Sequence, residues 1–152
     1  MDNFSRTVLR PCYGTQEWPD LVRIWRSAVE ATHDFLTQED IDYYERRMAT
    51  EYLAAVELTV AVVEEDVPIG FAGVAEGKLE MLFVDRVHRG HGAGSALLRR
   101  ALADIPDLSV DVNEQNPQAL GFYRHHGFAV LDRCETDADG RPFPILHLGR
   151  RS

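Results

Sequence analysis

The chain has 152 residues, of which 45% are hydrophobic and 27% are charged, and its net charge at pH 7 is −9. This length and composition predict one globular domain over residues 1–152, with a core that needs neither disulfides nor a structural metal. The negative charge argues against nucleic acid or an anionic membrane as the main partner. No segment has the ~20 apolar residues of a membrane span and the N-terminus lacks an apolar signal stretch, so we expect a cytoplasmic protein. The two cysteines, Cys12 and Cys134, are far apart in sequence and are expected to be reduced thiols.

The first third of the chain predicts a short strand and two amphipathic helices. Residues 8–10 have strand character and are followed by a proline. Apolar residues then recur at three- and four-residue spacing from Trp18 to Val29, which indicates a helix. Thr37 with Asp40 is typical of the N-cap of a second helix. The apolar face of that helix is expected to contain Ile41, Tyr44, Met48 and Tyr52.

From Leu58 the pattern changes to that of extended chain. Strands are predicted at 58–63, 69–75 and 78–84, and the short turns between them require an antiparallel meander. A glycine-rich loop follows, then a helix to about Ile105 and a strand at 108–112. Because a helix joins this strand to the one that ends at Val84, the two strands can run parallel.

The C-terminal part predicts a helix and a hairpin. Asn116-Pro117 is typical of a helix start and Gly127 of a helix end, so residues 117–126 are expected to be helical. Strands at 128–135 and 144–150 would form a hairpin around residues 137–140. The predicted order is β-α-α-β-β-β-α-β-α-β-β, an α/β domain with a mixed sheet and helices on its faces.

The segment LFVDRVHRGHGAGS, residues 82–95, carries the strongest indication of function. A strand runs into three alternating glycines, Gly90, Gly92 and Gly94, and a helix begins directly after them. Glycine lets backbone amides turn toward one point, and the helix N-terminus adds the positive end of its dipole, so the loop suits a phosphate. Arg86 and Arg89 would add positive charge.

Two kinds of nucleotide-binding loop fit this segment poorly. A Walker loop requires a lysine before the serine or threonine, and Gly94-Ser95 has none. A dinucleotide-binding fingerprint follows the first strand of its fold, whereas this loop lies more than halfway along the chain with its third glycine one position early. A flexible turn that only lets the helix pack on the strand stays an alternative.

The pattern Arg-x-x-Gly-x-Gly between a strand and a helix resembles the pyrophosphate loop of the GNAT family of N-acetyltransferases, which holds acetyl-coenzyme A. A second segment, NEQNPQALGFYRHHGF, resembles the Asn-x-x-Ala-x-x-x-Tyr helix of that family, which ends in Gly-Phe. The resemblance covers residues 8–150, and the segments IWRSAVEATHDFL, VNEQN and GRPFPIL are most similar to small bacterial members. It implies a GNAT fold and transfer of an acetyl group from acetyl-CoA to a primary amine by direct attack.

For the donor, the resemblance implies that the strand ending at Val84 diverges from its parallel neighbour and that the pantetheine arm enters the opening. Backbone amides near Phe83 and Val84 would then form the oxyanion hole. Asn116 would bond the pantetheine amides, and Phe122 would pack on the arm or in the core. Family members commonly have a proline near Arg86, so a change in loop shape with phosphate binding retained is expected. The residues expected to bind the donor are Leu82, Phe83, Val84, Arg89, Gly90, His91, Gly92, Ala93, Gly94, Ser95, Asn116, Ala119, Phe122 and Tyr123.

The resemblance also suggests catalytic groups. Tyr123 is the expected general acid that protonates the departing thiolate, and the alternative is a core tyrosine. Glu80 is the expected base, on a strand face shared with Leu82 and Val84, and the alternative is a solvated glutamate at a strand edge. The acceptor pocket is expected to be walled by His33, Asp34 and Phe35, which could equally be a hydrogen-bonded helix end.

The acceptor is expected to be a small-molecule or peptide amine, and an acidic cleft would favour a cationic one such as a polyamine, an aminoglycoside, a peptide N-terminus or a lysine side chain. The histidine pairs His88/His91 and His125/His126 lack the partners of a zinc site, so no metal is expected. A monomer or homodimer is expected. Two non-catalytic functions stay as alternatives, a coenzyme A sensor and a partner-binding domain.

Overall fold

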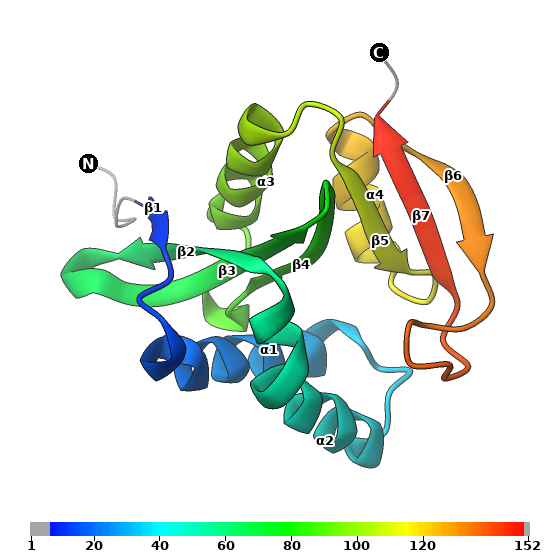
Figure 1. Ribbon diagram of the computed structural model, residues 1–152, viewed down its shortest axis with the longest axis horizontal. Coiled ribbons are helices and arrows are strands. Elements are labelled where there is room, and N and C mark those ends of the chain that lie inside the picture. The colour runs from blue at the N-terminus through cyan, green and yellow to red at the C-terminus, as the bar shows by residue number, and fades with distance from the viewer. Residues whose placement is uncertain (1–6, 151–152) are drawn as a thin grey trace.

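The computed structural model describes residues 7–150 and contains one seven-stranded mixed sheet with helices on both faces (Figure 1). The order of elements is the predicted one, and the α/β class is confirmed. The strand order in the sheet is β1-β2-β3-β4-β5-β7-β6. The strands are β1 (Val8–Pro11), β2 (Glu57–Val63), β3 (Val67–Ala75), β4 (Lys78–Val84), β5 (Ser109–Asn113), β6 (Phe128–Cys134) and β7 (Ile145–Arg150). The helices are α1 (Trp18–Thr32), α2 (Gln38–Arg47), α3 (Ala93–Asp104) and α4 (Pro117–His125).

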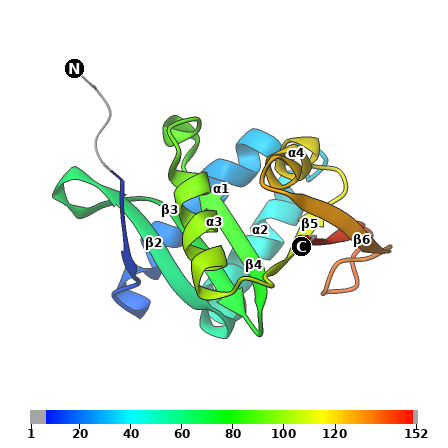
Figure 2. The same cartoon turned by 90° about the horizontal axis from the view of Figure 1, so that it is seen from above.

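The apolar stripes of the helices bury both faces of the sheet. Helices α1 and α2 cover one face, and α3 and α4 cover the other, as the two views show (Figures 1 and 2). One apolar cluster centres on Leu21, Ile24 and Phe71, and the other on Leu97 and Leu98 of α3. The periodicity in the sequence therefore identifies the buried stripes of α1 and α3 correctly.

Side-chain caps fix the starts of two helices where the sequence predicts them. Thr37 Oγ1 accepts from the Asp40 amide at 3.1 Å, and the Asp40 carboxylate accepts from the Thr37 amide at 3.0 Å. Asn116 Oδ1 accepts from the Ala119 amide at 3.2 Å and so caps α4. These bonds satisfy amides that have no partner within the helix.

Among the element boundaries that differ from the prediction, those of α2 and β3 have a structural reason. Helix α2 ends at Arg47 and continues as a π-helical turn, Met48–Tyr52, in which the chain keeps the direction of the helix but shifts its hydrogen bonds. Strand β3 begins at Val67 and not at residue 69. Pro68 lies opposite Val62 beside an irregularity in the ladder, where a residue without an amide hydrogen is tolerated.

The parallel pairing of β4 and β5 is short. It consists of the pairs Lys78–Ser109 and Leu79–Val110, after which the strands diverge. In the ladder with β3, Leu79 lies opposite Val74 and Met81 opposite Gly73, so Glu80 is the extra residue of a β-bulge. The opening between the diverging strands agrees with the predicted donor geometry.

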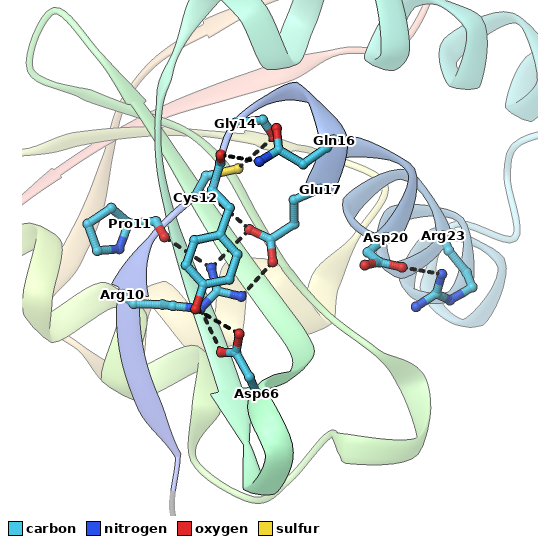
Figure 3. Close-up of polar contacts among 10 residues, drawn as sticks. Arg10, Pro11, Cys12, Gly14, Gln16, Glu17, Asp20, Arg23 and Asp66 are labelled. Atoms are coloured by element: carbon cyan, nitrogen blue, oxygen red, sulfur yellow. Dashed lines mark hydrogen bonds and ion pairs between the residues drawn. The ribbon is translucent and has the colours of Figure 1, made fainter.

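A buried ion pair joins β1 to the start of α1 (Figure 3). Glu17 accepts from two guanidinium nitrogens of Arg10, at 2.9 and 2.5 Å, and from the Tyr13 amide at 3.0 Å. The side chains of Arg10 and Glu17 are 13% and 6% exposed. The bonds from Arg10 hold the pKa of Glu17 below its usual range.

No helix within residues 7–150 is long and apolar enough to cross a membrane.

Candidate active site

Two cavities meet where β4 and β5 diverge. The first, about 510 Å³, lies against the glycine loop and is called the glycine-loop cavity. The second, about 350 Å³, lies between α1, α2 and the loop joining β6 to β7, and is called the acidic cavity. A site with this arrangement can bring one ligand from each side to a common point. The residues that line both cavities are His33, Leu82, Phe83, Asn116, Ala119 and Tyr123.

The glycine loop has the backbone of an anion site. Gly90 and Gly92 have φ angles of +82° and +91°, a left-handed conformation that favours glycine, and the space where their Cβ atoms would lie is open. Helix α3 begins at Ala93 without a side-chain cap. Its first amides can therefore point at a bound phosphate.

Charged and polar side chains surround this loop. Arg89 lines the glycine-loop cavity and donates to Gln118 Oε1 of α4 at 2.6 Å, which ties the loop to α4. His88 Nδ1 is buried without a hydrogen-bond partner in the described part of the chain. Of the residues predicted to bind the donor, all line this cavity except His91, which is exposed on the loop.

The segment between β4 and the glycines forms a single 3₁₀ turn, Arg86–His88. The Asp85 carboxylate accepts from the Val87 amide at 3.2 Å, and the Arg86 amide donates to Ser27 Oγ of α1 at 3.1 Å. The Arg86 side chain is not among those lining the glycine-loop cavity. The turn anchors the loop to α1, and Arg89 is the arginine that reaches the cavity.

The free backbone amides of β4 are those of Leu82 and Val84. The Asp85 amide donates to Ile69 O of β3 at 2.8 Å. Strand amides alternate between the two edges, so the amide of Phe83 also points toward β3, and those of Leu82 and Val84 point into the opening. The sequence analysis expected the backbone amides of Phe83 and Val84 to face the opening. In the structure the amide of Val84 does so, and the second amide is that of Leu82 instead of Phe83.

Tyr123 lies between the two cavities. Its residue is 6% exposed, and its ring packs edge-on against Phe122 and Phe128 at centroid distances of 5.2 and 5.8 Å. Its hydroxyl has no hydrogen-bond partner among residues 7–150. Burial raises the pKa of Tyr123, so the hydroxyl keeps its proton at neutral pH.

Glu80 lines the acidic cavity from the bulge in β4. Residues two apart in a regular strand face the same side of the sheet. Here Leu79 packs in the cluster of Leu97 and Leu98, whereas Met81 packs in the cluster of Leu21 and Ile24, so the bulge interrupts the alternation. The expectation that Glu80 shares a face with Leu82 and Val84 is therefore wrong. Burial and the nearby charge of Asp111 raise the pKa of Glu80.

The predicted acceptor wall is only partly present. His33 lines both cavities, whereas Asp34 and Phe35 line neither. The ring of Phe35 instead packs against the ring of His33, with 5.2 Å between the ring centroids. His33 is also the C-cap of α1, so this residue belongs both to the cavity wall and to the end of the helix. Burial lowers the pKa of His33 to about 4, so its ring is neutral at pH 7. Thr32 Oγ1 donates to Ala28 O at 2.9 Å and lies 2.8 Å from His33 Nδ1, which assigns the proton to Nδ1 and leaves Nε2 as an acceptor.

The acidic cavity takes its name from its charges. Its lining contains four carboxylates but no lysine or arginine from the described range 7–150. Lys78 and Arg47 contact Asp111 and Asp139 from outside the lining, at 3.1 and 3.4 Å. A cationic ligand would therefore be attracted into this cavity. The four carboxylates are Glu80, Asp111, Asp137 and Asp139.

Comparison with known proteins agrees with this geometry. The model of the acetyltransferase (GNAT) domain matches residues 27–144. The chain belongs to the GNAT family. It is 43% identical over 133 residues to the peptidyl-lysine N-acetyltransferase YjaB of Escherichia coli, covering 88% of this chain and 90% of that protein. It is 41% identical to the protein of the same name from Salmonella typhimurium, covering 88% and 91%.

The solution structure of apo YjaB from Escherichia coli superposes on this fold with a TM-score of 0.88 and 40% identity, covering 95% of this chain and 97% of that one. The GNAT fold is therefore confirmed. The chain is an N-acetyltransferase that transfers an acetyl group to an amine, and the two non-catalytic alternatives are set aside.

Three carboxylates of this GNAT site, Asp111, Asp137 and Asp139, were missed by the sequence analysis. Asp137 and Asp139 lie in the turn between β6 and β7, where aspartate and glycine are expected for backbone reasons alone. Asp137 does serve the turn, because it accepts from the amides of Asp139 and Arg141 at 3.0 and 2.9 Å. The phenols of Tyr44 and Tyr52 donate to Asp137 and Asp139, which joins the turn to the α2 region. Only the two aspartates on either side of Ala138 in the predicted turn could have pointed to Asp137 and Asp139.

Proposed function

We propose that this chain transfers the acetyl group of acetyl-CoA to the side-chain amine of a lysine in a peptide or protein. The observation that carries the proposal is the acidic cavity, which adjoins the glycine-loop cavity at Tyr123 and Asn116. A lysine side chain is a cation on a long apolar stem, and this cavity combines four carboxylates with apolar walls. The name of the relatives YjaB, peptidyl-lysine N-acetyltransferase, supports the same acceptor class.

The residues of the glycine-loop cavity suit acetyl-CoA, which supplies the acetyl thioester when bound. The uncapped start of α3, the two left-handed glycines and Arg89 would hold its diphosphate. Asn116 is fixed by its cap to the Ala119 amide, and its Nδ2 would donate to the pantetheine arm. The amides of Leu82 and Val84 would stabilise negative charge on the thioester oxygen.

Proton transfer would be divided between two side chains. The lysine must lose a proton before it attacks, and Glu80 would accept that proton directly or through water. Tyr123, whose hydroxyl is protonated and unpartnered, would give a proton to the departing thiolate. Because the amine attacks the thioester itself, no covalent enzyme intermediate is needed. Both cysteines are free thiols, which supports a cytoplasmic location.

The acceptor class is tested with full-length protein, acetyl-CoA and a panel of amines. A peptide with both ends blocked and one internal lysine is expected to gain one acetyl group on Nε, measured by mass spectrometry. The same peptide with arginine in place of lysine is the matched control. Acetylation of a free peptide N-terminus or of spermidine with no turnover of the lysine peptide would contradict the proposed acceptor.

Glu80→Gln is expected to lower kcat/KM for the lysine peptide about 10-fold at pH 7, because the base is removed. The raised pKa of Glu80 makes wild-type activity fall as acid protonates the carboxylate, and the variant should lose this acidic limb. Its deficit should shrink near pH 10, since free lysine amines titrate near 10.4. The measurement is a pH profile of initial rates. Glu57→Gln, at an exposed position that begins β2, is the control, and equal profiles for both variants would rule out Glu80 as the base.

A further inference from the structure

Three side chains from neighbouring strands form a connected row outside the proposed reaction. Cys134 Sγ of β6 lies 3.1 Å from His147 Nε2 of β7, and His147 Nδ1 lies 2.6 Å from Asp111 Oδ1 of β5. Asp111 and His147 are direct partners in the antiparallel ladder, so their side chains share one face of the sheet. Cys134 pairs with Ile145, two residues from His147, and so faces the same side.

The hydrogen bonds assign the proton positions in this row. An aspartate carboxylate only accepts, so His147 Nδ1 carries the hydrogen and Nε2 is left as the acceptor for the thiol. Lys78 Nζ lies 3.1 Å from Asp111 Oδ2, and this bond raises the pKa of Lys78. The ammonium thus stabilises the carboxylate that orients the imidazole. Asp132 lies directly opposite His147 on β6 and is the other ionisable residue paired with it.

We propose that Cys134 is a reactive thiol, activated by His147 and Asp111, that forms mixed disulfides with small disulfides. The arrangement has the three parts that activate a nucleophile: a thiol, a base in hydrogen-bond contact with it and a carboxylate that orients the base. Cys134 is exposed, so a small reagent can reach its sulfur.

The reaction balances without another reagent. His147 Nε2 takes the thiol proton, and the thiolate attacks one sulfur of the disulfide. A new sulfur–sulfur bond forms to Cys134, the old one breaks, and the second sulfur leaves as a thiolate with the bonding electrons. Cys134 is thereby oxidised and the small disulfide is reduced to one free thiol and one bound half.

The row is distinct from a metal site, and it meets the acidic cavity only through Asp111. His147 stands between the other two side chains, and no group of three potential ligands in the described part of the protein could hold a metal ion. Cys134 lines neither cavity. Its labelling therefore does not require the acetyl-transfer site, and failure of the proposed function would leave this inference untouched.

Cys12 provides an internal control. It is half-buried, its sulfur donates to Gly14 O at 3.5 Å, and burial raises the pKa of its thiol. We therefore expect the folded protein to react slowly at Cys12. Dividing each rate in the folded protein by the rate at the same cysteine in urea removes differences in local sequence.

The test is alkylation of the full chain by iodoacetamide at pH 7, followed at both cysteine peptides by mass spectrometry. An ordinary thiol is only a few per cent thiolate at this pH, so an adjacent base should raise the folded-to-urea rate ratio of Cys134 to about 10. His147→Asn and, separately, Asp111→Asn should lower that ratio to about 1 or less. The ratio for Cys12 should be below 1 in every variant. Circular dichroism checks that each variant is folded.

Oxidised glutathione serves as the small disulfide. The wild-type protein should gain one glutathionyl group on Cys134, and Cys134→Ser should gain none there. A wild-type ratio of 1 or less for Cys134 would overturn the proposal, as would an unchanged ratio in a folded His147 or Asp111 variant. If one variant does not fold, the wild-type ratio and the other variant decide.

Discussion

Replacing Tyr123 with phenylalanine is expected to lower kcat about 100-fold while leaving the Kd for acetyl-CoA unchanged. The substitution removes one hydroxyl that has no partner in the described structure, so it breaks no hydrogen bond of the fold. The ring contacts with Phe122 and Phe128 are kept. What is lost is the proposed proton donor at the junction of the two cavities. Thiol release from acetyl-CoA measures turnover, and isothermal titration calorimetry measures binding.

Tyr13→Phe is the matched control for this variant. Tyr13 is exposed, and its hydroxyl donates to Asp66 at 2.7 Å, away from both cavities. Its kcat should equal that of the wild type. Full activity in the Tyr123 variant would remove the phenol from the mechanism. A weakened Kd with unchanged kcat would instead assign Tyr123 to donor binding.

Glu17→Gln is expected to reduce the free energy of unfolding at pH 7 by about 1–3 kcal/mol. The change keeps the shape of the side chain but removes the bidentate anion of the Arg10 guanidinium, which is 13% exposed and keeps only its ion pair with Asp66. The folded-state pKa of Glu17 is lowered, so its contribution is fully present above the unfolded pKa near 4.5 and is lost as the pH falls through the folded value. Urea unfolding at pH 7 and at acidic pH measures both effects.

The same region provides a control in the exposed pair Asp20 and Arg23, which lies beside the buried pair (Figure 3). Their side chains are 44% and 64% exposed at a separation of 2.8 Å. Asp20→Asn should change stability by less than about 0.5 kcal/mol, because water screens such pairs. Equal losses in the Glu17 and Asp20 variants would show that the buried pair has no special role.

Elements that depend on local sequence were predicted well. The start of α4 follows from Asn116 and Pro117, since a cap and a proline act over a few residues. The capping box of Thr37 and Asp40 and the order of all strands follow in the same way. The residues predicted to bind the donor line one cavity, apart from His91, because a glycine loop, a strand end and a helix start are adjacent in the chain.

Features that depend on distant pairing were not predictable. The bulge at Glu80 arises from the register between β3 and β4, and no residue pattern within β4 announces it. The acidic cavity joins segments far apart in the chain, with Tyr44 contacting Asp137. The place of Asp137 in the cavity could not be predicted, because an aspartate is common in turns for backbone reasons. Its side chain both accepts from the turn amides and lines the cavity.

The brief junction between β4 and β5 divides the sheet into two half-sheets, β1 to β4 and β5 with β7 and β6, joined by two residue pairs. Strand edges without partners are places where foreign chains can add. A donor molecule that is hydrogen-bonded to both strand edges would link the two half-sheets. A ligand that binds only the folded chain adds RT ln(1 + [L]/Kd) to the free energy of unfolding, so the stability of this enzyme would rise with the concentration of its own donor.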